Sequence, residues 1–400
     1  MRVVVCVLNN YYEGINMHVH APLSLIATIL LVVVLGAVPA TALAAGTGET
    51  AMFRYNAQHT GDYSLVAGGR ASDDRLNWNY MTGGIVESSP AVANGIVYVG
   101  SHDHSIYALD VDTGAKVWSY ATGDRIFSSP TVANGIVYLG SNDKNVYALN
   151  AETGEKVWSY KTGNAVWSSP AVANGIVYVG SWDRNIYALN AETGGLVWSY
   201  MTGNAVWSSP SVANEIVYVG SNDKNVYALN AETGEKVWSY KTENSVESSP
   251  AVANGIVYVG SDDSNVYALN AGTGWLVWRH ATGDRVLSSP AVANGIVYVG
   301  SHDHNIYALN AKTGAKVWSY VTGGGVDSSP AVTNGYPAIA NGVVYVGSND
   351  YNIYALKAAT GRLVWSYMTG GIVSYSSPAV DGGVVYVGNW NHSIYALDRS

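Results

Sequence analysis

Cysteine is almost absent from the sequence, since the only residue of this type is Cys6, which precedes the apolar segment of the N-terminus. The rest of the chain therefore has no thiol for a disulfide, a thiolate nucleophile or a cysteine metal site. Phenylalanine is also scarce, with 2 residues against 30 Tyr and 13 Trp. This uneven use of aromatic residues indicates that one short pattern is copied many times.

Basic residues are few and scattered, because 20 Lys plus Arg stand against 29 Asp plus Glu, for a net charge of -9. Nucleic acids and anionic membrane surfaces bind clusters of basic side chains. We therefore expect neither as a partner. A helical period of apolar residues is missing as well, and Gly and Pro recur too often to leave room for long helices.

Charge is missing altogether from residues 21–45. The run LSLIATILLVVVLGAV leads into PATALAAG, where Ala42 and Ala44 form the small-x-small pattern of a signal-peptidase site. The strongly apolar part is about 16 residues long, which is short for a membrane-spanning helix. We interpret this segment as a cleaved signal peptide or, alternatively, a retained anchor, with translation starting at Met1 or Met17. The mature chain is then expected to be secreted, periplasmic or on the cell surface.

A 40-residue repeat fills most of the remaining chain. The tripeptide Ser-Ser-Pro recurs every 40 residues except for a last interval of 48, and it begins at Ser88, Ser128, Ser168, Ser208, Ser248, Ser288, Ser328 and Ser376. An insertion at 334–342 supplies most of the extra length. A fixed period of this size is the signature of a repeat architecture.

Each repeat predicts four short strands. In the unit that begins at Ser168, SSPAVA runs into Asn174-Gly175, a strong two-residue hairpin signal, and IVYVGS, IYALN and LVWSY follow between polar turns. Side chains grow from the small ones of SSPAVA to the Trp of the last strand, which suits wedge-shaped units around an axis. The predicted fold is all-β, an eight-bladed β-propeller of four-stranded antiparallel blades.

The two ends of the chain are expected to meet in one blade. The sequence ends in SIYALDRS without a final Trp strand, whereas RLNWNY, which contains Trp78, precedes the first Ser-Ser-Pro. The N-terminal strand should therefore complete the last blade and close the ring. This gives three parts: residues 1–45 as signal peptide or membrane anchor, 46–72 as a lead-in segment, and 73–400 as the propeller.

The repeat resembles a known family. The phrases ALDVDTGAKVW, from Ala108, and ALNAETGEKVW, from Ala148, resemble the tryptophan-docking motif of the PQQ-repeat, or quinoprotein-like, propellers. The motif occurs seven times, once with Lys357 in place of Asp or Asn, and the likeness covers residues 73–400. That family includes quinoprotein alcohol dehydrogenases and the non-enzymatic BamB-like scaffold of outer-membrane protein assembly. The resemblance implies a structural docking role for Trp78, Trp118, Trp158, Trp198, Trp238, Trp278, Trp318 and Trp365.

Differences between the repeats mark a candidate binding face. Because strands alternate in direction, the link before Ser-Ser-Pro and the turn after VYVGS emerge on the same face, with the link residues near the mouth of the central channel. These are also the segments that vary most. The candidate interaction residues are Glu87, Trp167, Trp207, Glu247, Asp327 and Tyr375 in the links, and Trp182 and Trp390 in the turns.

Each of these candidates has a structural alternative. Trp167 and Trp207 would either stack on a planar ligand or pack against each other, and the carboxylates would either hold a cation or lie in solvent. The HDH sequences at 102–104 and 302–304 lie three blades apart, so they would not share a compact metal site. We therefore assign no catalytic, cofactor-binding or metal-binding residue.

The sequence favours a binding function over catalysis. The quinoprotein dehydrogenases that the repeat resembles usually carry long insertions, an adjacent cysteine pair, and a calcium ion near a catalytic Asp, and none of these can be mapped onto the blades. Residues 141–162 are identical to 221–242, whereas an active site needs a unique set of groups. We predict a non-catalytic, secreted or cell-surface scaffold for a protein or glycan partner, with no cofactor. The alternatives are a carbohydrate- or small-ligand-binding propeller and a PQQ-dependent dehydrogenase with calcium.

Overall fold

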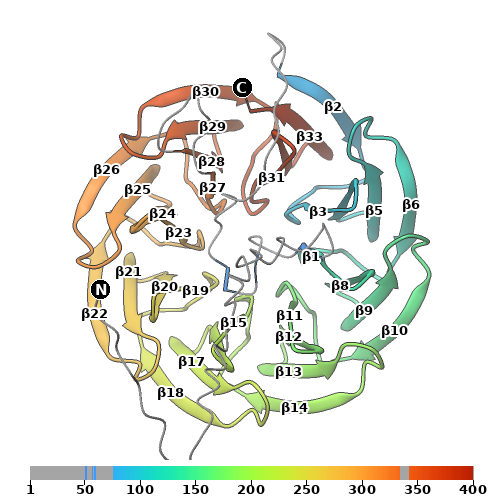
Figure 1. The fold of residues 1–400 in the computed structure, drawn as a ribbon, viewed down its shortest axis with the longest axis horizontal. Coiled ribbons are helices and arrows are strands. Elements are labelled where there is room, and N and C mark those ends of the chain that lie inside the picture. Colours follow the sequence, from blue (N-terminus) through green and yellow to red (C-terminus); the bar gives the residue numbers. More distant parts are fainter. Residues whose placement is uncertain (1–49, 52–55, 57, 60–74, 334–341, 400) are drawn as a thin grey trace, which may run out of the picture. The chain divides into compact units, whose positions relative to one another are not determined.

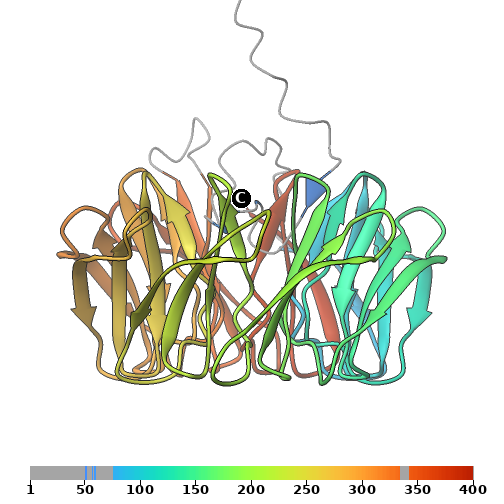
Figure 2. The ribbon, with the colours of Figure 1, turned by 90° about the horizontal axis from the view of Figure 1, so that it is seen from below.

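Eight sheets surround one central axis in the computed structural model, which describes residues 50–51, 56, 58–59, 75–333 and 342–399. Figure 1 shows the sheets arranged as the blades of a propeller, and Figure 2 shows the same ring from the side. The predicted all-β, eight-bladed fold is confirmed. Among these residues no helix is long and apolar enough to cross a membrane. The predicted signal or anchor segment, 1–45, lies outside them.

Each blade runs from an inner strand beside the axis to an outer strand at the rim. The inner strands are β3 (Ala91–Ala93), β7 (Thr131–Ala133), β11 (Ala171–Ala173), β15 (Ser211–Ala213), β19 (Ala251–Ala253), β23 (Ala291–Ala293), β27 (Ala331–Thr333) and β31 (Ala379–Asp381). The second strands are β4 (Ile96–Gly100), β8 (Ile136–Gly140), β12 (Ile176–Gly180), β16 (Ile216–Gly220), β20 (Ile256–Ser261), β24 (Ile296–Gly300), β28 (Val343–Gly347) and β32 (Val384–Gly388). The third strands are β5 (Ser105–Asp110), β9 (Asn145–Asn150), β13 (Asn185–Asn190), β17 (Asn225–Asn230), β21 (Asn265–Asn270), β25 (Asn305–Asn310), β29 (Asn352–Lys357) and β33 (Ser393–Asp398). The outer strands are β6 (Lys116–Ala121), β10 (Lys156–Lys161), β14 (Leu196–Met201), β18 (Lys236–Lys241), β22 (Leu276–Ala281), β26 (Lys316–Val321), β30 (Leu363–Met368) and, in the last blade, β2 (Leu76–Met81). We number the blades 1 to 8 from the blade that begins with β3.

The hydrophobic core consists of the interfaces between neighbouring blades. On blade 3, Tyr178 and Trp198 pack against Val217 and Val219 of blade 4, and all four side chains are buried. Because both faces of every blade are covered by its neighbours, the second and third strands are apolar on both faces. Their polar residues are confined to strand ends and turns, such as Asn174-Gly175, which adopts positive φ at both positions.

The docking tryptophans join each blade to the next. Trp158 of blade 2 is 8% exposed, and its Nε1 donates a 2.9 Å hydrogen bond to the backbone oxygen of Ala191 in blade 3. Equivalent bonds are made by the other seven framework tryptophans. The glycine of the motif is explained by the same contact, since Gly194 has φ 71° and a Cβ there would lie 2.7 Å from the Trp158 ring.

The ring is closed by the first strand of the repeat region. Strand β2 pairs antiparallel with β33, and Trp78 lies opposite Ala396. The predicted completion of the last blade by the N-terminal strand is therefore confirmed. The predicted insertion near residue 334 falls largely on 334–341, outside the described residues.

The second serines of the Ser-Ser-Pro segments form a ring of hydrogen bonds around the channel, which we call the serine belt. The sequence predicted only that these residues are small enough to lie near the axis. The backbone N–H of Ser89 donates to Ser129 Oγ of the next blade at 2.9 Å, and the series ends when the N–H of Ser377 donates to Ser89 Oγ at 2.8 Å. The six bonds between complete the circle. The first serine of the segment accepts a hydrogen bond within its own blade, as Ser88 Oγ does from the N–H of Gly100.

The lead-in segment is attached to the inner strands at the end away from Ser-Ser-Pro. Strand β1 (Thr50–Ala51) pairs antiparallel with β7 as a fifth strand of blade 2. Further along, the N–H of Val252 donates to the Gln58 oxygen at 2.9 Å, and Gln58 Nε2 donates to the Val212 oxygen at 3.1 Å. The lead-in thus contacts blades 2, 4 and 5 at one end of the channel, and the Ser-Ser-Pro end forms the other.

Candidate functional site

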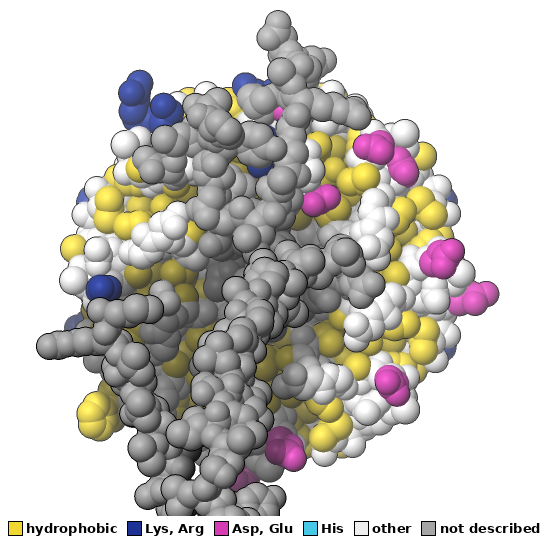
Figure 3. Space-filling view, in the orientation of Figure 1, with side chains coloured by type: hydrophobic (Ala, Val, Ile, Leu, Met, Phe, Trp, Pro, Cys, Tyr) yellow, Lys and Arg dark blue, Asp and Glu magenta, His cyan; other side chains and the backbone are white. Residues whose placement is uncertain are grey.

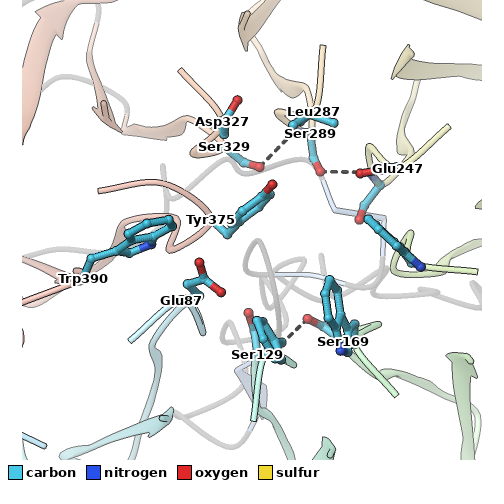
Figure 4. Close-up of a pocket in the computed structure, with 14 residues that line it drawn as sticks. Glu87, Ser129, Ser169, Glu247, Leu287, Ser289, Asp327, Ser329, Tyr375 and Trp390 are labelled. Carbon is cyan, nitrogen blue, oxygen red and sulfur yellow. Dashed lines mark hydrogen bonds between the residues drawn. The ribbon is translucent and has the colours of Figure 1, made fainter. Parts of the chain in front are cut away.

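A cavity of about 440 Å³ lies at the Ser-Ser-Pro end of the channel. We call it the mouth pocket. It is lined by five serines of the belt and by Glu87, Phe127, Trp167, Trp207, Glu247, Leu287, Asp327, Tyr375 and Trp390. Figure 4 shows these residues around the opening, with Tyr375 pointing toward its middle. All eight link residues therefore converge on one cavity.

The framework holds each link residue in place from both sides. Trp167 stands between Val166 and Ser168, which are both fully buried. A Cβ on Gly140 of the preceding blade would lie 2.3 Å from Val166 Cγ1, so glycine is needed for this close approach. Because the valine and the serine are fixed, the side chain between them is directed toward the channel, whatever its type.

Aromatic rings gather on the side of the pocket formed by blades 1 to 4. We call His102, Phe127, Trp167, Trp182 and Trp207 the aromatic arc. Phe127 stacks on Trp167 with centroids 4.2 Å apart, and Trp182 stacks on Trp207 at 4.9 Å. Trp167 lies 5.0 Å from Trp207 and donates through Nε1 to Asn142 Oδ1. The two link tryptophans thus pack against each other and also line the cavity.

Carboxylates gather on the remaining side, and two of them are buried. Glu87 and Asp327 are 7% and 6% exposed. His102 Nε2 lies 3.0 Å from Glu87 Oε2, and His302 Nδ1 lies 3.1 Å from Asp327 Oδ1. Asp327 also accepts a 2.9 Å hydrogen bond from Asn349. The expectation that the carboxylates lie in solvent is wrong for Glu87 and Asp327, because residues of the neighbouring turns cover both.

Glu247 differs from the other two carboxylates because no hydrogen bond to its side chain occurs among the described residues. Burial raises the pKa of Glu247 to about 7, and repulsion from Asp262 and Asp327 adds to this, while Arg285 opposes it. Burial likewise raises the pKa of Asp262. We call Glu87, Glu247, Asp262 and Asp327 the acidic arc. Asp262 and Asp327 lie close enough to Glu247 to hinder its ionisation, so the potential at Glu247 is negative.

Tyr375 completes the acidic side as a hydrogen-bond donor. Burial raises the pKa of its phenol, and the charges of Asp327, Glu247 and Glu87 raise it further. The hydroxyl therefore stays protonated at neutral pH. Tyr375 comes from blade 8, so polar groups from blades 1, 5, 7 and 8 meet here.

The turn residues predicted for the site have different positions. Trp390 lines the mouth pocket and is 38% exposed. Trp182 does not line it, but it supports Trp207 through the stacked contact. Sequence reasoning left out Phe127, Leu287 and Asp262 as site residues, although they occupy the same two variable columns of the repeat as the residues it selected.

The described residues contain no group of three or more His, Cys, Asp and Glu side chains placed to hold a metal ion. His102 and His302 are each bonded to a different carboxylate, and His104 lies 3.8 Å from Asp124.

On the other face of the ring, equivalent positions of different blades carry more similar residues. Figure 3 shows acidic side chains mainly on the right and lower parts of this face, and basic ones mainly at the upper left and left. The exposed Glu152, Glu192 and Glu232 occupy the same position in three successive repeats. A position that repeats in this way belongs to the framework and does not define a unique site.

The sequence matches one protein family along most of its length. The family is described as outer membrane protein assembly factor BamB, and the match covers residues 62–169, 161–248 and 241–400. No curated protein sequence shows significant similarity to the chain.

Solved structures share the fold at low sequence identity. BamB from Moraxella catarrhalis is 17% identical with a TM-score of 0.69, over 81% of this chain and 99% of that one. The computationally designed Ika8 protein is 20% identical with a TM-score of 0.72, over 81% and 99%. The quinohemoprotein alcohol dehydrogenase of Comamonas testosteroni is 17% identical with a TM-score of 0.73, over 86% and 80%. Likeness at these identities extends to the fold and not to the chemistry.

Proposed function

Since the chain belongs to the outer membrane protein assembly factor BamB family, we propose that it is a non-catalytic propeller that acts as an interaction scaffold. Its partner is engaged through the mouth pocket and the turns around it. The partner is a protein or a glycan encountered outside the cytoplasm, in the periplasm or at the cell surface.

One observation carries this proposal. The blades repeat the same docking bond and the same serine belt around the ring, whereas side chains of six different residue types project into the mouth pocket from the eight link positions. Stability of the ring requires no such variation, because the neighbouring valine and serine hold each link regardless of the residue between them. Variation concentrated at and around one cavity is typical of a binding site.

Among the described residues, no group of three or more His, Cys, Asp and Glu side chains is placed to hold a metal ion, which supports a non-catalytic role. Solved structures of dehydrogenases share the fold, but Glu87 and Asp327 of the mouth pocket lie against histidines, and Glu247 is repelled by Asp262 and Asp327. Calorimetric titration of the purified protein with pyrroloquinoline quinone, with and without calcium, tests this part. We expect no binding. Tight, calcium-dependent binding would instead indicate a dehydrogenase and would overturn the proposal.

A second candidate, binding of a small ligand, is favoured by the aromatic arc. Trp167, Trp207 and Trp390 line a cavity whose volume lies within the range typical of small-molecule sites. Exposed indole rings are common platforms for sugars and other ligands with apolar faces. A glycan array screened with the labelled protein separates this candidate from binding to a protein surface alone.

The proposed location has a separate test. Mass spectrometry of the mature N-terminus, after fractionation of the producing cells, distinguishes cleavage near residue 45 from a retained anchor. Recovery of the uncleaved chain in the cytoplasmic fraction would contradict a role outside the cytoplasm.

A further inference from the structure

The mouth pocket combines aromatic rings on one side with carboxylates on the other. Indole and phenyl rings form the side contributed by blades 2 to 4, and carboxylates form the side contributed by blades 5, 7 and 1. Aromatic faces attract cations through their quadrupole, and carboxylates attract them by charge. A ligand that satisfies both sides carries positive charge together with apolar carbon.

Two carboxylates on the acidic side, one in the pocket wall and one behind it, have an oxygen without a hydrogen-bond partner among the described residues. Asp262 Oδ1 is buried without a hydrogen-bond partner in the described part of the chain, and Glu247 accepts no hydrogen bond there. Buried acceptors are normally satisfied by a donor. Glu247 lines the mouth pocket, where a positively charged group would satisfy it, and Asp262 adds negative charge from behind it.

Basic side chains leave this charge largely uncompensated. His102 and His302 lie against Glu87 and Asp327 and not against Glu247. Arg285 is exposed and acts on Glu247 and Asp262 from a distance, because no ion pair of Arg285 within 4.0 Å occurs among the described residues. Net negative charge therefore remains beside Glu247, next to the tryptophans of blades 3 and 4.

We propose that the mouth pocket binds an organic ammonium ion between the aromatic arc and the Glu247 side of the acidic arc. The ion is either a free small molecule or the end of a lysine side chain on a partner. This inference rests on the proposed binding function and names the chemical group that the site takes.

Choline and its uncharged isostere 3,3-dimethylbutan-1-ol provide the sharpest probes, because they differ only in charge. In calorimetric titrations of the whole protein at pH 8, we expect choline to bind about tenfold or more tightly than the alcohol. Equal affinities, or no binding of either compound, would overturn the ammonium assignment. Nα-acetyl-lysine N-methylamide, titrated in parallel, distinguishes the two sources: tighter binding of this amide indicates a partner side chain, and tighter binding of choline indicates a free ligand.

Variants of matched charge locate the site. Glu247→Gln should weaken choline binding about tenfold and leave the alcohol unaffected, whereas Arg285→Gln should strengthen choline binding. Glu155→Gln removes the same charge from an exposed position on an outer-strand turn and should change nothing. Melting temperatures of all three variants show whether each is folded. If Glu155→Gln weakens choline as much as Glu247→Gln does, the attraction is a general effect of net charge and the assignment is wrong.

These outcomes separate this inference from the proposed function. Binding of the quinone with calcium would remove the scaffold proposal whatever choline does. Equal binding of choline and the alcohol would remove only the ammonium assignment, and the mouth pocket would remain a binding cavity of another specificity.

Discussion

The indole Nε1 of Trp158 donates a 2.9 Å hydrogen bond to the backbone oxygen of Ala191, which belongs to the following blade. The same ring covers Gly194, where a Cβ would lie 2.7 Å from it. A single side chain thus anchors one blade to the turn of the next. Repeated around the ring, this contact makes the stability of each blade depend on its neighbour.

Trp158→Ala should lower the free energy of unfolding by about 3 to 5 kcal/mol, because it removes a buried indole and leaves a cavity between blades 2 and 3. Trp275→Ala is the control, since Trp275 is 77% exposed and its loss should cost less than about 0.5 kcal/mol. Chemical denaturation followed by circular dichroism measures both. Similar losses for the two variants would show that docking contributes little.

Two glycines separate backbone strain from the docking contact. Gly175 and Gly194 have φ values of 75° and 71°, but a Cβ on Gly175 meets nothing within 4 Å. Gly175→Ala should cost only the strain of a left-handed residue, about 1 to 2 kcal/mol. Gly194→Ala adds a clash with Trp158 and should cost clearly more. Equal melting temperatures of the two alanine variants would contradict the proposed contact.

The raised pKa of Glu247 makes the fold less stable as pH rises. Below pH 4.5, its ordinary pKa, the carboxyl is protonated in both the folded and unfolded states and has no effect. Between there and about pH 7 the unfolded chain ionises while the folded one resists, so stability is lost across this window and stays lost above it. Glu247→Gln should therefore stabilise the protein at pH 8 relative to the parent, and leave it unchanged at pH 4. Thermal melts across this range test the sign.

Ammonium binding should show the opposite trend with pH. Glu247 faces Asp262, Asp327, Tyr375 and Arg285, and it carries its full charge only above about pH 7. Choline should therefore bind more weakly at pH 6 than at pH 8 in the parent protein. In Glu247→Gln this difference should shrink, with Asp262 left as the remaining contributor. An affinity that does not change between the two pH values would argue against Glu247 as the group that attracts the cation.

The fold could be predicted because every repeat contains the same turn residues, docking tryptophan and strand pattern. Three features depend only on contacts within a blade or with the next blade: the Asn174-Gly175 turn, the docking Trp158, and the terminal strand with Trp78. Because the sequence repeats every 40 residues, the turn and the docking contact can be predicted for the other blades as well. The column of link residues could also be placed at the channel mouth, since strand direction alone decides the face. These inferences required no knowledge of side-chain contacts.

Contacts between the link residues before Ser-Ser-Pro and the turn residues after VYVGS could not be predicted. His102 pairs with Glu87 and His302 with Asp327 across different spacings, 15 and 25 residues apart, and the repeat does not distinguish the two. The serine belt was hidden for a different reason, because a residue that never varies gives no hint of which atom it bonds. Gln58 lies in a lead-in that has no counterpart among the repeats, so its contacts with blades 4 and 5 appear only in the structure.

A crystal structure of the protein with choline tests the central claim most directly. The account predicts density for the trimethylammonium group in the mouth pocket, in contact with the Trp207 ring and facing the Glu247 carboxylate. Choline bound only on the outer rim, or an empty mouth pocket at saturating choline, would contradict it.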